Sequence, residues 1–94
     1  MITVIATVRA APGKGPALEA DFRDYAAWVK ANEPGTLMYT LSRSKEDPEL
    51  YYALETYADQ AAVDTHMRNF GNRQGGAKDV AAGPPQILVL DRII

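Results

Sequence analysis

Three segments of the chain alternate apolar and polar residues with the period of two that is typical of a β-strand. They cover residues 2–9, 36–44 and 50–57. A fourth apolar segment follows Gly83-Pro84-Pro85 and predicts a last strand over residues 86–94. β-Branched and aromatic side chains are frequent in these segments, which favours strands further. The pattern therefore predicts four strands.

Two other segments repeat their apolar residues every three or four positions, which is the period of an α-helix. The first covers about residues 16–32 and the second begins after Asp59, whose carboxylate is expected to cap the free amides of its first turn. Their apolar stripes are Leu18, Phe22, Tyr25 and Val29 in the first, and Val63, Met67 and Phe70 in the second. Two amphipathic helices are thus predicted.

Proline and glycine mark the connections between these elements. Glu33-Pro34-Gly35 is expected to end the first helix, because a residue before proline leaves the α region and glycine admits positive φ. Glycines at 71, 75, 76 and 83 argue against a long helix over residues 71–83, where only a short helix at 77–82 is expected. This polar stretch is either a mobile lid or a passive surface loop.

The resulting order, β-α-β-β-α-β, predicts a ferredoxin-like α+β fold over a single domain, residues 1–94. Its four-stranded sheet is antiparallel, with both helices on one face. The strands nevertheless carry large apolar side chains on both faces, since Leu50, Tyr52 and Leu54 alternate with Tyr51, Ala53 and Tyr57. We expect a second copy of the chain to cover the open face in a homodimer. The alternative is a scatter of exposed apolar residues, which is common on protein surfaces.

Composition removes several classes of function. Ten Lys and Arg residues stand against twelve Asp and Glu, the net charge is −2, and no basic segment is present, so nucleic acid is not an expected partner. The chain has no cysteine and one histidine, which leaves no expected metal site. Its apolar runs are too short to span a bilayer, and no signal segment is visible at the start. We expect a soluble cytoplasmic protein without a membrane partner.

Two motifs give the chain a family resemblance. The segment Glu33-Pro34-Gly35-Thr36-Leu37-Met38-Tyr39 resembles the E-P-G-x-L-x-Y signature of the antibiotic biosynthesis monooxygenase (ABM) family. The spacing of Glu55, Tyr57, Asp59, Ala62 and His66 resembles that family's E-x-W-x-(D/S)-x-x-A-x-x-x-H run, with tyrosine where many relatives have tryptophan. The likeness extends over nearly the whole chain.

The resemblance implies a dimeric α+β barrel with a pocket between helices and sheet in each protomer. It also implies a quinol-type monooxygenase that oxidises a small electron-rich aromatic, such as a quinol, hydroxyarene or polyketide-like phenol, with molecular oxygen. No flavin, metal or other cofactor is expected, because the substrate itself supplies the electrons. Such chemistry needs a dry aromatic pocket, one proton acceptor and a donor for the peroxide.

The candidate catalytic residues are His66 and Tyr57. His66 is the side chain best suited to move protons near neutral pH, and it is expected at the margin of the helix–sheet interface. A structural, hydrogen-bonding role for His66 stands as the alternative. Tyr57 keeps an aromatic ring at the pocket and adds a hydroxyl donor.

The candidate substrate-pocket residues are Glu55, Phe70, Tyr51 and Trp28. For Glu55 a structural role, paired with a backbone amide or an arginine, is the favoured interpretation. Tyr51 and Tyr39 also fit core or dimer-face positions, and Trp28 also fits a boundary position against the sheet.

Two other classes of function remain open at this point. The chain could be a non-catalytic module that binds a hydrophobic small molecule, or an isomerase or decarboxylase on the same dimeric α+β barrel. Oxygen uptake with reduced quinones and hydroxyarenes separates these alternatives from a monooxygenase.

Overall fold

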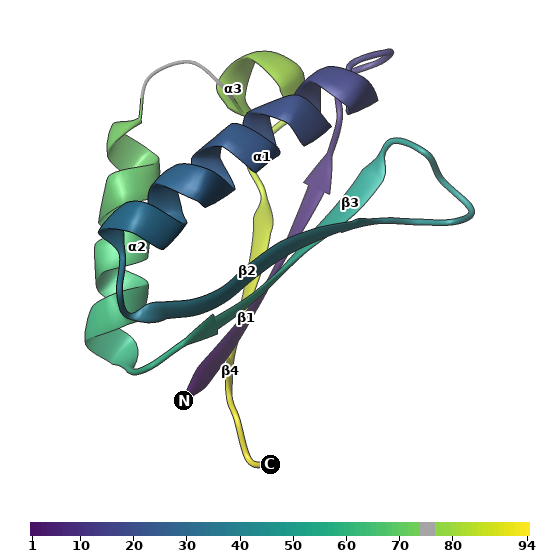
Figure 1. Cartoon of the computed structure of the whole chain (residues 1–94). Coiled ribbons are helices and arrows are strands. Elements are labelled where there is room, and N and C mark those ends of the chain that lie inside the picture. Colours follow the sequence, from purple (N-terminus) through teal and green to yellow (C-terminus); the bar gives the residue numbers. More distant parts are fainter. Residues whose placement is uncertain (74–76) are drawn as a thin grey trace.

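The computed structural model describes residues 1–73 and 77–94, and its elements follow the β-α-β-β-α-β order expected from the sequence (Figure 1). The strands are β1 (Ile2–Arg9), β2 (Thr36–Arg43), β3 (Leu50–Tyr57) and β4 (Gln86–Asp91). The helices are α1 (Gly15–Asn32), α2 (Gln60–Asn72) and the one-turn α3 (Ala77–Val80). In Figure 1 the two long helices lie on the same side of the sheet, so the ferredoxin-like prediction is confirmed.

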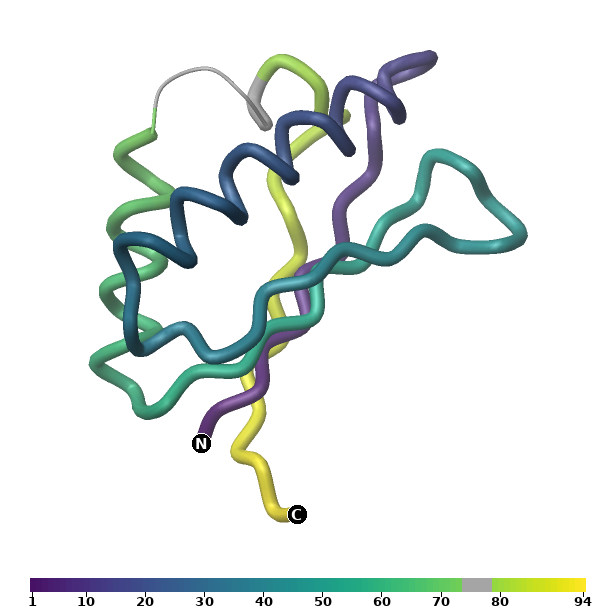
Figure 2. The backbone as a smooth tube through the Cα atoms, viewed as in Figure 1, coloured from purple at the N-terminus to yellow at the C-terminus, as the bar shows by residue number. Residues whose placement is uncertain are grey.

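The sheet has the strand order β2-β3-β1-β4, and every neighbouring pair is antiparallel. Figure 2 traces the chain through this sheet, with the two termini at the same end. The register builds rows of side chains across the strands. One row on the helix side is Ile87, Ala6, Ala53 and Leu41, and the next is Val89, Val4, Glu55 and Tyr39.

Several element ends depart from the sequence-based expectations, and α3, expected over residues 77–82, ends at Val80. Helix α2 continues through Gly71 to Asn72, because one exposed glycine in a last turn costs only about 1 kcal/mol. Strand β4 ends at Asp91 instead of residue 94. The prediction for Asp59 is confirmed, since its Oδ1 accepts a hydrogen bond of 2.9 Å from the Ala62 amide. The sequence leaves open whether the stretch 71–83 is a mobile lid or a passive surface loop. Residues 74–76 of this stretch lie outside the described residues.

The buried core is divided into two clusters beneath the helices. One consists of Ile2, Val4, Tyr57 and Val63, and the other of Ala10, Leu18 and Tyr51. Between them the sheet presents Ala6 and Ala53, which are direct cross-strand partners. Because these side chains are only methyl groups, the middle of the helix-facing surface is left hollow.

The opposite face of the sheet carries large apolar side chains that the chain itself leaves exposed. They include Met38, Tyr52, Leu54, Leu88 and Leu90. Strand β4 is exposed along its whole length. No helix among the described residues is long and apolar enough to cross a membrane.

Candidate active site

A cavity of about 280 Å³ occupies the hollow between α1, α2 and the sheet. Ala6 and Ala53 form part of its floor, and aromatic and aliphatic side chains form most of its walls. Its polar lining residues are Asp21, Glu55, His66, Arg73 and Tyr39. A concave, mostly apolar space with a few converging polar groups is the usual form of a small-molecule site.

Sheet register brings two of these polar groups together. Tyr39 on β2 is the direct partner of Glu55 on β3, and both project to the helix side of the sheet. The Tyr39 ring packs edge-on against His66, with 4.9 Å between ring centroids. On its other side Tyr39 stacks on Phe22 at 4.7 Å. This cross-strand pair therefore places the Glu55 carboxyl and the Tyr39 ring next to His66 of α2.

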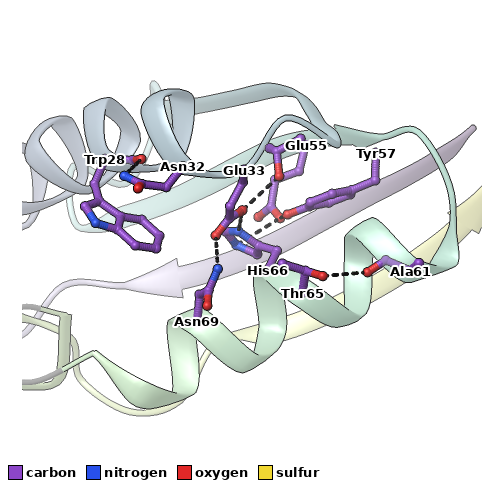
Figure 3. A network of polar contacts seen from close by, with 10 residues as sticks. Trp28, Asn32, Glu33, Glu55, Tyr57, Ala61, Thr65, His66 and Asn69 are labelled. Atoms are coloured by element: carbon purple, nitrogen blue, oxygen red, sulfur yellow. Dashed lines mark hydrogen bonds and ion pairs between the residues drawn. The ribbon is translucent and has the colours of Figure 1, made fainter.

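Glu33, which follows α1, is the centre of the hydrogen-bond network in Figure 3. Its Oε1 is 2.8 Å from His66 Nδ1 and accepts a 2.9 Å bond from Thr36 Oγ1. Asn69 Nδ2 donates to the other oxygen at 3.0 Å. Glu33 is only 3% exposed, so these donors replace the water that its carboxylate loses.

Close packing between the turn and α2 makes this network possible. A Cβ on Gly35 would lie 2.6 Å from the Cβ of Ala62, one helical turn before His66. Such a distance is too short for any side chain, so glycine is required at this approach. Gly35 does not have positive φ, contrary to the expectation from the sequence. Its role is to let α2 lie against the turn that carries Glu33.

His66 lies between two carboxyl groups. Glu33 occupies its Nδ1 side, and Glu55 Oε1 lies 3.8 Å from its Nε2 (Figure 3). The expectation that His66 sits at the margin of the interface is wrong, because the residue is only 3% exposed. The rings of Tyr39 and Tyr57 cover it from the sheet side. His66 is thus a core residue that also lines the cavity.

The environments of the two glutamates move their pKa values in opposite directions. Burial acts to raise the pKa of Glu33, but the hydrogen bonds from Asn69, His66 and Thr36 outweigh it and hold that pKa below its usual range. Burial is also the main influence on Glu55, and it raises the pKa of this carboxyl despite the hydrogen bond from Tyr57. The pKa of Glu33 therefore lies below, and that of Glu55 above, the usual range of a glutamate carboxyl.

This difference determines how His66 carries its proton. An ionised Glu33 has only acceptor oxygens, so His66 Nδ1 donates to it. In the neutral imidazole Nε2 is then the free acceptor, which faces Glu55 and the cavity. Burial raises the pKa of Tyr39 and Tyr57 well above the usual tyrosine range and that of Tyr25 to about 12. Nε2 is thus the imidazole nitrogen that Glu33 leaves unbonded on the cavity side.

The far end of the cavity holds an ion pair between α1 and the end of α2. Arg73 Nη2 and Nη1 lie 2.8 and 3.2 Å from the two carboxylate oxygens of Asp21. The guanidinium also lies 4.2 Å above the centroid of the Tyr25 ring. Both charged side chains line the cavity.

The sequence-based site residues have different positions. Glu55, Phe70 and His66 line the cavity. Tyr57 does not line it, but its hydroxyl donates to Glu55, so it is one contact away. Glu55 contacts this tyrosine and His66, and among the described residues neither a backbone amide nor an arginine, the expected partners, bonds to it.

The structure places Tyr51 and Trp28 outside the cavity. Tyr51 lines a separate hollow of about 370 Å³ beyond the Phe22–Tyr39 stack, and its hydroxyl donates to Glu19 at 2.6 Å. Trp28 is 43% exposed and stacks on Tyr25 instead of on the sheet. Figure 3 shows Trp28 apart from the network around His66.

The sequence-based prediction does not single out four polar residues of the site, namely Asp21, Glu33, Tyr39 and Arg73. It places Glu33 at a helix end and in the family motif, Tyr39 in the core or at the dimer face, and Arg73 in a polar stretch. For Glu33 a signal was present, since a glutamate followed by proline and glycine begins the family motif. In the described part of the chain, no group of three or more His, Asp or Glu side chains is arranged to hold a metal ion.

Comparison with known proteins agrees with this architecture. A candidate ABM from Caulobacter crescentus is 39% identical, with a TM-score of 0.84 over 99% of this chain and 90% of its own. A Pseudomonas aeruginosa protein of known structure is 32% identical, with a TM-score of 0.79 over 99% and 94%. A candidate ABM from Nitrosomonas europaea, at 18% identity and a TM-score of 0.83 over both full lengths, shares the fold. No curated protein matches the chain.

The family assignment rests on the match of a family model to most of the chain. The model for antibiotic biosynthesis monooxygenase matches residues 1–73, which include α1, α2 and the network around His66. The family model and the structure from Caulobacter crescentus carry the same family description. This protein therefore belongs to the antibiotic biosynthesis monooxygenase family.

Proposed function

We propose that the protein is a cofactor-independent monooxygenase that oxidises a small electron-rich aromatic with molecular oxygen. The substrate class is a quinol, hydroxyarene or polyketide-like phenol. The observation that carries the proposal is His66, which Glu33 holds through Nδ1 while Nε2 faces an apolar, aromatic-walled cavity. Family membership supports the same class of reaction.

In the proposed reaction His66 Nε2 takes the proton of a substrate hydroxyl. The resulting anion gives one electron to oxygen, and the phenoxyl and superoxide radicals combine to a peroxide. Protonation and loss of water then leave a quinone, so one oxygen atom enters the product and the other leaves as water. Glu33 stabilises the imidazolium formed in the first step, because its carboxylate lies 2.8 Å from Nδ1.

Glu55 is proposed to supply the proton that the peroxide needs. Its carboxyl lines the cavity, and burial raises its pKa, which makes it a better proton donor near neutral pH than an exposed glutamate. Tyr57 donates to Oε1 of this group and orients it. A base and an acid whose pKa values are moved apart by their surroundings are typical of proton-transfer sites.

The test is oxygen uptake with a panel of reduced quinones and hydroxyarenes, using metal-free protein and subtracting autoxidation. His66→Ala is expected to lower turnover about 10²–10⁴-fold, the range typical of a general base. Turnover should survive chelation. The matched control is Trp28→Phe, which changes an aromatic residue outside the cavity and should leave turnover within about twofold.

Stability must be measured on the same variants. If His66→Ala destabilises the protein but each folded protomer turns over normally, His66 is a structural residue and the mechanism is wrong. Binding of the aromatics without oxygen uptake would identify a binding module instead of an enzyme.

We also propose that a second copy of the chain covers the outer face of the sheet. The exposed apolar residues of that face belong to β2, β3 and β4, and the partly buried Ile5 of β1 joins Leu54 to Leu88 across the register. Contiguous apolar surface of this kind is usually an interface. Sedimentation should give about twice the 10.3 kDa chain mass, and a stable monomer would contradict the proposal.

A further inference from the structure

The cavity has a polar group at each end. His66 and Arg73 are seven residues apart, two turns, so their Cα atoms are separated by roughly 10 Å along α2. Phe70, one turn after His66, lies between them, and all three residues line the cavity. A ligand held at its hydroxyl by His66 therefore presents its opposite end to Arg73.

At the Arg73 end of the cavity, the Asp21 carboxylate neutralises the positive charge of the guanidinium. Both terminal nitrogens of Arg73 contact the Asp21 carboxylate, one to each oxygen. The pair is mostly withdrawn from solvent, with 19% of each side chain exposed. In this environment the attraction between the two charges is screened less than on an open surface. Arg73 thus offers a ligand hydrogen-bond donors but little net positive charge.

The two possible kinds of ligand end-group respond differently to this arrangement. A carbonyl oxygen can accept from an Arg73 hydrogen that Asp21 does not use, since guanidinium carries five donors. A carboxylate instead meets Asp21 at short range, and among the described residues no second cation besides Arg73 lines the cavity. Glu55 at the opposite end adds no attraction for an anion.

Resting on the proposed function, we infer that Asp21 is a specificity-determining residue that makes the cavity select neutral, carbonyl-bearing phenols over phenols that carry a carboxylate. The alternative role for the ion pair is a structural clamp between α1 and α2. A clamp affects stability, but its loss does not selectively change how tightly the charged and the uncharged ligand with the same ring system bind.

The test compares 6-hydroxy-2-naphthoate with its methyl ester, which has the same rings and hydroxyl but no charge. Calorimetric titration under nitrogen measures binding without turnover. We expect the ester to bind wild type at least about tenfold more tightly. Asp21→Asn should reduce this preference to within about threefold, because it frees the charge of Arg73. Arg73→Gln should preserve or increase the preference, because it leaves Asp21 unopposed.

The matched control is Glu19→Gln. It makes the same charge change on the same helix, but Glu19 pairs with Arg43 and lines the neighbouring hollow. Its ester preference should equal that of wild type. The inference is wrong if wild type binds the carboxylate as tightly as the ester, if Asp21→Asn leaves the preference unchanged, or if neither ligand binds.

These outcomes are separable from those of the oxygen-uptake experiment. Selective binding without turnover would keep Asp21 as the selector and remove the monooxygenase proposal. Turnover without the ester preference would keep the monooxygenase proposal and remove Asp21 as the selector. Thermal melting of each variant shows whether a lost preference reflects the cavity or an unfolded protein.

Discussion

Two tyrosines on β3 donate their hydroxyl hydrogens to glutamates, yet the two pairs have opposite electrostatic outcomes. The hydrogen bond from Tyr51, together with Arg43, lowers the pKa of Glu19. Burial raises the pKa of Glu55, although Tyr57 donates to it in the same way. The Glu19 side chain is 33% exposed and that of Glu55 only 4%. The same kind of hydrogen bond therefore accompanies a lowered carboxyl pKa at the more exposed site and a raised carboxyl pKa at the buried one.

The largest loss of stability is expected when the buried hydrogen-bond network around His66 loses the Glu33 carboxylate. Glu33→Ala removes the acceptor shared by Thr36, His66 and Asn69 and leaves buried donors without partners. We expect the free energy of unfolding to fall by about 3–5 kcal/mol, measured by urea denaturation. Glu19→Ala is the control at the exposed pair and should cost clearly less. Equal losses would contradict the contrast between the two sites.

A smaller effect is expected from deleting each tyrosine hydroxyl. Tyr57→Phe leaves the buried Glu55 without its donor and should cost about 1–3 kcal/mol. Tyr51→Phe should cost less, because Arg43 still pairs with Glu19 at 2.9 Å. Thermal and urea unfolding of both variants measure the difference. A larger loss for Tyr51→Phe would reverse the order that burial predicts.

Glu55 and Glu19 should also make the stability of the protein depend on pH in opposite directions. Above the usual glutamate pKa, folded protein still holds the Glu55 proton that the unfolded chain has lost, so stability falls as pH rises through this interval. Below it, folded protein has lost the Glu19 proton that the unfolded chain binds, so stability falls as pH drops. Glu55→Gln should flatten the first slope and Glu19→Gln the second, in denaturation series from acid to neutral pH.

The smallest effect is expected for a third tyrosine that has no carboxyl partner. The buried hydroxyl of Tyr25 has no hydrogen-bond partner among the described residues. Tyr25→Phe should therefore leave stability unchanged or raise it by about 1 kcal/mol, since it removes an unsatisfied polar atom. A clear loss in thermal melting would mean that this hydroxyl has a partner, such as a bound water, which the variant eliminates.

The fold could be predicted almost completely because its signals are local. Alternation marked β1, β2 and β3 within a residue of their ends, and the cap at Asp59 is a short-range hydrogen bond. The errors lie where a local rule competes with packing. Gly71 stays helical at the exposed end of α2, and Gly35 is required for the approach of Ala62 rather than for a positive φ.

The site was less predictable because it depends on contacts between distant segments. The Glu33–His66 pair joins residues 33 positions apart, and Arg73 meets Asp21 across 52. Neither pairing has a periodic signature in the sequence. Helical spacing placed His66 beside the apolar stripe, but it could not show that Glu33 fills the remaining side of the imidazole. Trp28 shows the converse, since its size favoured burial and the structure exposes it.

The place of Glu33 at the end of α1 has a consequence for the charge that the reaction creates. The last carbonyl groups of an 18-residue helix point in the same direction, and the helix dipole gives its C-terminus about half a negative charge. A carboxylate there opposes the dipole and depends on donors from β2 and α2. In the proposed reaction the imidazolium would form beside the Glu33 carboxylate, at this negative end of the helix. Helix α1 would then favour proton uptake through its backbone, a contribution that no side-chain substitution at the cavity removes.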